Sequence, residues 1–196
     1  MERKLLIDEV TIQKRILQLA DEINRDYKGK ELTIICILKG SMYFCSDLSR
    51  RIDCPTEIEF MRLSSYKGKN STGKVDVKVG LDHSIKGKDV LVVEDIIDSG
   101  RTLSFLLEYL KLDEPNSIRL CTLLDKPSRR EPGIDIKVDY VGFTIRDRFV
   151  VGYGLDLDEE YRNLPEIQCF TKDSDKVVQK EADDIRNQLI KTKLKK

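Results

Sequence analysis

VLVVEDIIDSGRT, at positions 90–102, joins an unbroken apolar run to three carboxylates and a glycine turn. The apolar run at 90–93 predicts a strand that is buried on both faces, as in a parallel sheet. Glu94 and Asp95 follow where this strand leaves the sheet. Because ligands bind outside the carboxyl ends of the strands in open α/β sheets, we expect a ligand site at this edge.

The second half of this stretch, from Asp98 to Thr102, opens the next predicted helix. The unpaired amides and the dipole of a helix start attract anions, and Gly100 lets a phosphate approach the backbone closely. Asp98 or Thr102 alone would be typical of a helix cap. Together with the two carboxylates on the strand, the turn favours a ligand that carries both sugar hydroxyls and a phosphate. It is neither a Walker A loop nor a G-x-G-x-x-G motif, because the required glycines and lysine are missing.

Strands and helices alternate on both sides of this stretch. Apolar runs and polar–apolar alternation predict strands, and apolar residues at helical spacing predict helices. We expect strands at 32–38, 57–63, 75–79, 90–93, 118–124, 138–143 and 149–153, and helices at 12–23, 42–52 and 103–110. This order predicts an α/β domain around a mainly parallel sheet.

The composition indicates a globular protein with no global attraction to nucleic acid. The 196 residues suffice for one domain, and 35 basic side chains balance 35 acidic ones. No apolar run approaches the roughly 20 residues of a membrane span, and the charged start lacks a signal-peptide core.

Cysteine and histidine usage narrows the chemistry. Five scattered cysteines form no C-x-x-C pair, which favours reduced thiols over a disulfide framework or a zinc site. His83 is the only histidine, which excludes a multi-histidine metal site. We therefore expect a cytoplasmic protein.

The C-terminal tail differs from the rest of the chain. Val178, Ala182, Ile185 and Leu189 lie at helical spacing, and four of the last six residues are lysines. The pattern is typical of an exposed terminal helix with a frayed basic end. An oligomer contact or a site for an anionic partner stays open as an alternative.

Residues 90–102 resemble the phosphoribosyl-diphosphate signature of type I phosphoribosyltransferases, and EDIIDSG at 94–100 has the form of the hypoxanthine–guanine branch. The resemblance continues in order to about Phe170. It implies an α/β, single-domain type I phosphoribosyltransferase fold, with a mainly parallel central sheet flanked by helices, a small hood and a flexible lid hairpin. The domain would span residues 1–170, and 171–196 would be a helical C-terminal extension.

The resemblance also implies roles for the residues of the opening stretch. Glu94 and Asp95 match the acids that hold the ribose hydroxyls. Asp98 matches the acid near purine N7, where a carboxylate can take the proton as N9 bonds to the sugar. The adjoining substrate-binding residues would be Ile97, Ser99, Gly100, Arg101 and Thr102, with 98–102 forming the 5′-phosphate cradle.

Other parts of the chain match further parts of the family site. Leu38, Lys39 and Gly40 resemble the diphosphate loop, which in family members often has a non-proline cis peptide; alone, they would be a simple strand–turn. Ser65 and Tyr66 match the pair at the base of the lid, at about 64–74. The remaining matches are Lys126 for the purine O6, Tyr140 for base stacking, Val141 for the ring edge, Asp147 for the second Mg²⁺ and the C2 edge, and Arg162 for the diphosphate. Tyr140 and Val141 could equally be core packing.

The resemblance implies Mg²⁺ as cofactor, with Glu94, Asp95 and Asp147 as the metal-binding acids. It implies 5-phosphoribosyl 1-diphosphate and 6-oxopurine bases as substrates, and a homodimer or homotetramer. No membrane or nucleic-acid partner is expected. Three alternatives stay open: another base, such as xanthine or a pyrimidine; a regulator of the same fold that binds RNA; and a protein whose tail serves mainly in assembly.

Overall fold

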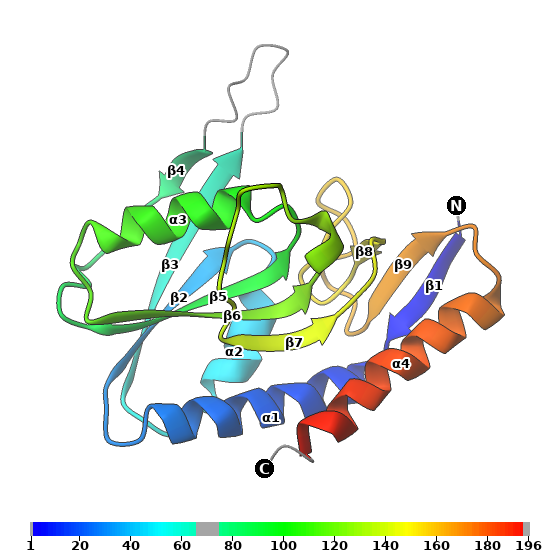
Figure 1. Cartoon of the computed structure of the whole chain (residues 1–196), viewed down its shortest axis with the longest axis horizontal. Helices are drawn as coiled ribbons and strands as arrows, with labels where there is room; N and C mark the ends of the chain where they lie inside the picture. The colour runs from blue at the N-terminus through cyan, green and yellow to red at the C-terminus, as the bar shows by residue number, and fades with distance from the viewer. Residues whose placement is uncertain (1, 66–74, 194–196) are drawn as a thin grey trace.

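The computed structural model describes residues 2–65 and 75–193, in which two sheets are flanked by helices (Figure 1). The larger sheet has the strand order β4-β3-β2-β5-β6-β7 and the smaller one the order β1-β9-β8. The larger sheet consists of β2 (Leu32–Leu38), β3 (Thr56–Ser65), β4 (Val75–Val79), β5 (Asp89–Ile97), β6 (Ser117–Asp125) and β7 (Tyr140–Thr144). All of its neighbouring pairs are parallel except β3 with β4, as predicted for a mainly parallel α/β fold.

Helices cover both faces of the larger sheet. Helices α1 (Glu9–Asp26) and α2 (Met42–Ser49) pack on the face that carries Ile34 and Leu91, and α3 (Arg101–Lys111) packs on the face that carries Ile35 and Val92. Alternate residues of β2 and β5 therefore enter two separate cores. This explains why the central parts of both strands, residues 34–38 and 90–93, are continuously apolar rather than alternating.

The smaller sheet forms the hood beside the carboxyl edge of the larger one. It consists of β1 (Glu2–Ile7), β8 (Phe149–Val151) and β9 (Ile167–Thr171), all antiparallel. The sequence analysis did not predict β1 and β9, because both strands are short and mix polar with apolar residues. They pair with each other across 160 or more residues of the chain.

The C-terminal tail forms α4 (Asp175–Lys193), which lies along β1 and the start of α1 (Figure 1). Its residues Val178, Ala182 and Ile185 are buried, and Glu181 forms a buried ion pair with Arg148 at 2.5 Å. The helix is therefore part of the main core, rather than the exposed appendage that its composition indicated. This packing disfavours a role for the tail in assembly alone.

Strands β3 and β4 form a hairpin whose arms pair from Arg62–Val79 to Ser65–Val75, as predicted. The remainder of the predicted lid, including Tyr66, lies outside the described residues. All five cysteines are free thiols. Within residues 2–65 and 75–193, no helix combines the length and apolarity that crossing a bilayer requires.

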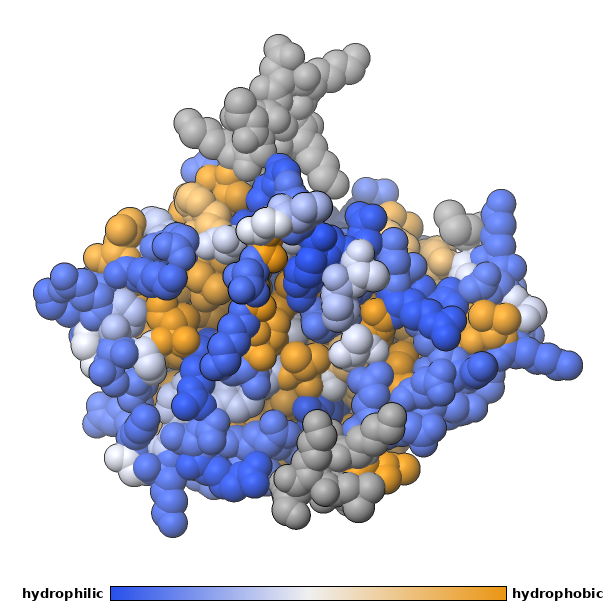
Figure 2. Space-filling model, viewed as in Figure 1, coloured by the Kyte–Doolittle hydropathy of each residue, from blue (hydrophilic) through white to orange (hydrophobic). Residues whose placement is uncertain are grey.

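Hydrophilic side chains cover most of the face seen in Figure 2. Hydrophobic residues reach this surface mainly over α3 and the adjoining strands. Two aromatic side chains of α3, Phe105 and Tyr109, expose 38% and 40% of their surface, and their ring centroids stack 6.3 Å apart.

Candidate active site

The predicted ligand edge of the larger sheet contains two adjoining hollows. A cavity of about 350 Å³ lies between the end of β2, the end of β5 and the loop before β9, and a smaller one of about 130 Å³ lies at the turn from β5 into α3. Glu94 and Thr102 line both cavities. The hydroxyl of Thr102 makes no hydrogen bond with any residue that the structure describes, so it is available to a ligand.

Glu94 and Asp95 are half-buried carboxylates side by side at the end of β5. Burial, and then the charge of Asp95, raises the pKa of Glu94 well above its ordinary value. Burial also raises the pKa of Asp95, opposed by hydrogen bonds from Glu94 and the Ile96 amide and by the charge of Arg162. Because these two negative charges lie together where little water reaches them, the site favours either a cation or a ligand whose hydroxyl groups can donate hydrogen bonds to the carboxylates.

The loop after β2 touches this carboxylate pair. The Leu38–Lys39 peptide is cis, at the position that the resemblance indicated. Gly40 is buried, and a Cβ on it would lie 1.4 Å from Asp95 Oδ2. A Cβ on Gly154 would in turn lie 1.8 Å from the Gly40 carbonyl oxygen. Glycine is therefore required at both positions for the loop to approach Asp95.

The predicted glycine lies in the turn at the start of α3. Gly100 is the N-cap residue of α3, with φ of 82°, which a residue with a side chain rarely adopts. Ser99 accepts a long hydrogen bond of 3.4 Å from the Arg101 amide, and the Asp98 side chain does not cap the helix.

Arg130, which the sequence analysis did not predict, forms hydrogen bonds that hold the backbone of this turn. Its Nη1 donates to the carbonyl oxygens of Ile97 at 3.0 Å and Asp98 at 2.6 Å, and its Nη2 pairs with Asp125. The side chain is only 19% exposed, so these bonds are well shielded from water. Arg130 therefore fixes the backbone that presents Asp98.

Asp98 faces a second arginine that sequence reasoning also missed. Arg129 Nε donates to Asp98 Oδ1 at 3.1 Å, and its Nη1 lies 3.7 Å from Asp147 Oδ2. Arg129 thus connects the end of β5 with the loop after β7. Both carboxylates lie at the ligand edge, where they were predicted.

Lys126 lies next to this group, at the end of β6. Its backbone amide donates to the Ile97 carbonyl oxygen at 3.0 Å, and only 6% of the residue is exposed. Its ammonium group forms no ion pair or hydrogen bond within the described residues. Because no described residue pairs with it, the Lys126 ammonium group is left to water or to a ligand acceptor.

Lys39 and Arg162 meet on the far side of the larger cavity. Arg162 Nη1 donates to the Gly154 carbonyl oxygen at 2.8 Å, and its Nη2 lies 2.9 Å from Asp156 Oδ1. Glu159 Oε2 lies 2.9 Å from Lys39 Nζ and 3.2 Å from Arg162 Nη2. Asp156 and Glu159 line the cavity and were not predicted, since acids in a loop give no distinctive sequence signal.

Tyr140 and Val141 were wrong as base-contacting residues. Tyr140 begins β7, at the edge opposite the site, and its hydroxyl donates to Asp26 Oδ2 at 2.7 Å and accepts from Arg119 at 2.6 Å. The Val141 carbonyl oxygen accepts from Arg15 Nη2 at 2.6 Å. Both residues therefore connect β7 to α1 and to the amino half of β6, and cannot contact a base at the carboxyl edge.

The predicted metal-binding acids lie in two separate places. Among the described residues, no three acids, cysteines or histidines come together closely enough to hold an ion. Glu94 and Asp95 are adjacent, but Asp147 lies with Arg129 and Asp98 instead. The side chains of Ser65 and Tyr66 lie outside the described part of the structure.

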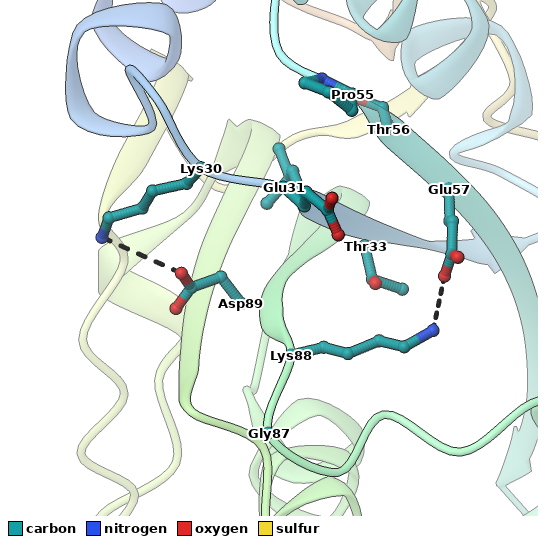
Figure 3. A pocket seen from close by; sticks show the side chains of 10 residues that line it. Lys30, Glu31, Thr33, Pro55, Thr56, Glu57, Gly87, Lys88 and Asp89 are labelled. Atoms are coloured by element: carbon teal, nitrogen blue, oxygen red, sulfur yellow. Dashed lines mark hydrogen bonds and ion pairs between the residues drawn. The ribbon is translucent and has the colours of Figure 1, made fainter.

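A larger cavity of about 550 Å³ lies at the opposite, amino edge of the sheet (Figure 3). Both of its lysines pair with carboxylates, Lys88 with Glu57 at 2.5 Å and Lys30 with Asp89 at 3.9 Å, and Glu31 is the one other charged residue among the described ones that line it. Neutralised pairs of this kind leave little unbalanced charge for a ligand. The carboxyl edge, with its adjacent carboxylates and free ammonium, is therefore the candidate active site.

Comparison with known proteins agrees with this site. The family model of the phosphoribosyl transferase domain matches residues 7–158, which defines the class of protein. The hypoxanthine phosphoribosyltransferase of Salmonella typhimurium is 50% identical over 165 residues, 83% of this chain and 92% of the relative. That of Escherichia coli K12 is 47% identical over 167 residues, 84% of this chain and 93% of the relative. The chain belongs to the phosphoribosyltransferases and, among them, to the hypoxanthine phosphoribosyltransferase family.

Solved structures lead to the same family. A hypoxanthine-guanine phosphoribosyltransferase from Bacillus anthracis has a TM-score of 0.81 and 46% identity, over 86% of this chain and 98% of that one. A hypoxanthine phosphoribosyltransferase from Staphylococcus aureus also has a TM-score of 0.81, with 47% identity over 86% of this chain and 91% of that one. Nothing in these comparisons supports the alternative of an RNA-binding regulator.

Proposed function

We propose that this protein transfers the 5-phosphoribosyl group from 5-phosphoribosyl 1-diphosphate to N9 of hypoxanthine and of guanine. The products are inosine or guanosine monophosphate and diphosphate. The proposal rests on the groups that meet at one edge of the sheet. These are the anion-binding turn at Gly100, the adjacent carboxylates of Glu94 and Asp95, and Lys126, whose ammonium group has no partner among the described residues. Each of these groups suits a different part of the two substrates.

The sugar diphosphate fits the two adjoining cavities. The 5′-phosphate binds at the turn around Gly100, where the amides that follow Arg101 and precede the first helical hydrogen bond, together with the Thr102 hydroxyl, can donate. The ribose hydroxyls donate to Glu94 and Asp95, which relieves the repulsion between these carboxylates. The diphosphate binds between Lys39 and Arg162, two of the three cations that line the larger cavity.

The purine base binds beside Asp98 and Lys126. Lys126 donates to O6, which favours a 6-oxopurine over adenine, whose 6-amino group is a donor. Asp98 takes the N7 proton as N9 attacks the sugar. In place of Tyr140, Phe149 is the aromatic residue suited to stacking: it is 51% exposed and stands two residues after Asp147.

Mg²⁺ fits this site as a companion of the diphosphate. The described residues contain no three-acid cluster for a protein-held ion, while Glu94 and Asp95 offer hard oxygen donors with raised pKa values. When bound there, Mg²⁺ supplies charge neutralisation on the leaving diphosphate. The protein then contributes the two carboxylates and the two cations that orient the sugar diphosphate.

We also propose a homodimer or homotetramer that works in the cytoplasm. The five free thiols suit a reducing compartment, and Ile58 and Phe60 expose 45% and 48% of their surface on β3. Sedimentation analysis tests the assembly, and a monomer at assay concentrations contradicts it.

The experiment that tests the function is nucleotide formation from 5-phosphoribosyl 1-diphosphate with hypoxanthine, guanine, xanthine, adenine or uracil. We expect turnover of the 6-oxopurines, little with adenine or uracil, and loss of turnover when a chelator removes Mg²⁺. Lys126→Met is the matched variant: it keeps the length of the side chain and removes its charge, so the preference for hypoxanthine over adenine falls. Absence of turnover with all five bases overturns the proposal.

A further inference from the structure

Glu159 joins two of the cations that line the larger cavity, Lys39 and Arg162. Its Oε2 atom accepts from Lys39 Nζ at 2.9 Å and lies 3.2 Å from Arg162 Nη2. These contacts, first with Lys39 and then with Arg162, lower the pKa of Glu159, so its side chain is an anion at neutral pH. A carboxylate oxygen thus occupies the place between two cations where an anionic ligand would bind.

The backbone of the loop holds Glu159 in this place. Its amide donates to Asp156 Oδ2 at 2.9 Å, and the other oxygen of Asp156 pairs with Arg162. Asp158 and Glu159 have φ of 52° and 69°, a conformation that residues with side chains adopt only when their surroundings enforce it. The Glu159 side chain is therefore presented to the cavity by a specifically folded loop and not by chance rotation of a surface residue.

We propose that Glu159 is an internal anion that occupies the diphosphate position and sets the affinity of the site for diphosphate. It holds Lys39 and Arg162 in their working positions in the free enzyme, and the incoming diphosphate displaces it. The same competition lets Glu159 return to the two cations and aid the release of the diphosphate product. This inference rests on the proposed function, because it assumes that Lys39 and Arg162 bind diphosphate.

The test is Glu159→Gln, which keeps the shape of the side chain and removes its charge. Glu160→Gln is the matched control: it removes the same charge one residue away, and the exposed Glu160 side chain makes no hydrogen bond or ion pair with any described residue. Binding of inorganic diphosphate with magnesium chloride is measured by calorimetry for both variants. We expect about 3- to 10-fold tighter binding for Glu159→Gln only, on the scale of one or two exposed ion pairs.

Steady-state kinetics supply a second readout that a purely structural role would not produce. We expect Glu159→Gln to lower the KM for the sugar diphosphate and leave the KM for hypoxanthine unchanged. Equal or weaker diphosphate binding in Glu159→Gln, compared with Glu160→Gln, overturns the inference while leaving the proposed function intact. If wild-type protein binds no diphosphate and makes no nucleotide, both proposals fail.

Discussion

Strand β5 carries carboxylates at both ends, and their environments shift the pKa values in opposite directions. At its start, a hydrogen bond from Ser117 lowers the pKa of Asp89, aided by Asn116 and the charge of Lys30 and opposed by burial. At its end, burial and the charge of Asp95 raise the pKa of Glu94. The negative charge of Asp89 therefore stabilises the folded protein, whereas the negative charge of Glu94 destabilises it.

The two edges of the sheet differ in the same way. The amino-edge cavity is larger, about 550 Å³ against about 350 Å³, yet both of its lysines are paired with carboxylates (Figure 3). The carboxyl edge keeps like charges adjacent and leaves Lys126 and Thr102 without protein partners among the described residues. Charged groups without compensating partners, rather than the volume of the cavity, therefore indicate the position of the active site.

The largest expected effect comes from Asp98→Asn at the carboxyl edge. An amide cannot accept the N7 proton, so we expect kcat to fall by about 10²-fold or more, the scale of general base catalysis. The KM values should change little, since asparagine keeps an acceptor for Arg129. Initial rates of nucleotide formation measure this. Glu57→Gln, at the amino edge, should retain wild-type rates, and similar losses in both variants would contradict the distinction between the edges.

Two glycine-to-alanine substitutions, one at each edge of the sheet, should lower the free energy of unfolding by similar amounts. In Gly40→Ala the new Cβ would lie 1.4 Å from Asp95 Oδ2, so Asp95 must move, at about 1–3 kcal/mol. In Gly87→Ala the Cβ meets nothing within 4 Å, and only φ of 69° costs about 1–2 kcal/mol. Denaturant titration should therefore show similar destabilisation in both.

Activity should separate these two glycine variants. We expect Gly40→Ala to raise the KM for the sugar diphosphate roughly tenfold or more, because a misplaced carboxylate no longer meets the ribose. Gly87→Ala should keep wild-type kinetics. A normal KM in Gly40→Ala would show that Asp95 does not contact the sugar.

Removing the charge at either end of β5 should change stability in opposite directions. Without substrate at neutral pH, we expect Glu94→Gln to raise the Tm and Asp89→Asn to lower it, each by about 2–4 °C for roughly 1 kcal/mol. Thermal unfolding followed by circular dichroism measures both. A lower Tm for Glu94→Gln would contradict the view that its charge is unfavourable in the folded protein.

The pH dependence of these shifts has a definite sign. Asp89 has a lowered pKa, so its stabilisation is present above its ordinary value, about 4, and is lost as the pH falls through the folded value. Glu94 has a raised pKa, so its charge destabilises the fold as the pH rises above about 4. Both differences from wild type should therefore shrink in acid. Differences that persist at low pH would come from packing instead.

The sequence predicted the main sheet, the helices and the ligand edge, because these depend on local patterns. Residues 90–102 indicate both a buried strand and an anion-binding turn, and the structure confirms the strand and the left-handed Gly100. The error at Tyr140 has a physical cause. An aromatic residue in a strand has the same local pattern at either end, and only the register with β6 shows that Tyr140 lies at the amino end.

The supporting groups of the site could not be predicted for a related reason. Arg129, Arg130 and Glu159 are charged residues in loops, and such residues are usually solvated. Their contacts depend on distances between segments far apart in sequence, such as Lys39 and Glu159. For Glu159 they also depend on a left-handed backbone that no motif encodes. These are properties of the folded chain and not of any local stretch.

The smallest expected effect concerns the Lys88–Glu57 pair at the amino edge. With 35% and 64% of their side chains exposed, these residues form an ordinary surface ion pair at 2.5 Å. A double-mutant cycle with Lys88→Gln and Glu57→Gln should give a coupling of about 0.2–1 kcal/mol, weaker at high salt. Turnover and diphosphate affinity should stay unchanged in all three variants. Glu159→Gln and Glu57→Gln each remove one carboxylate from an exposed ion pair. If only Glu159→Gln changes the affinity for diphosphate, the effect comes from the position of Glu159 in the larger cavity and not from the loss of a negative charge alone.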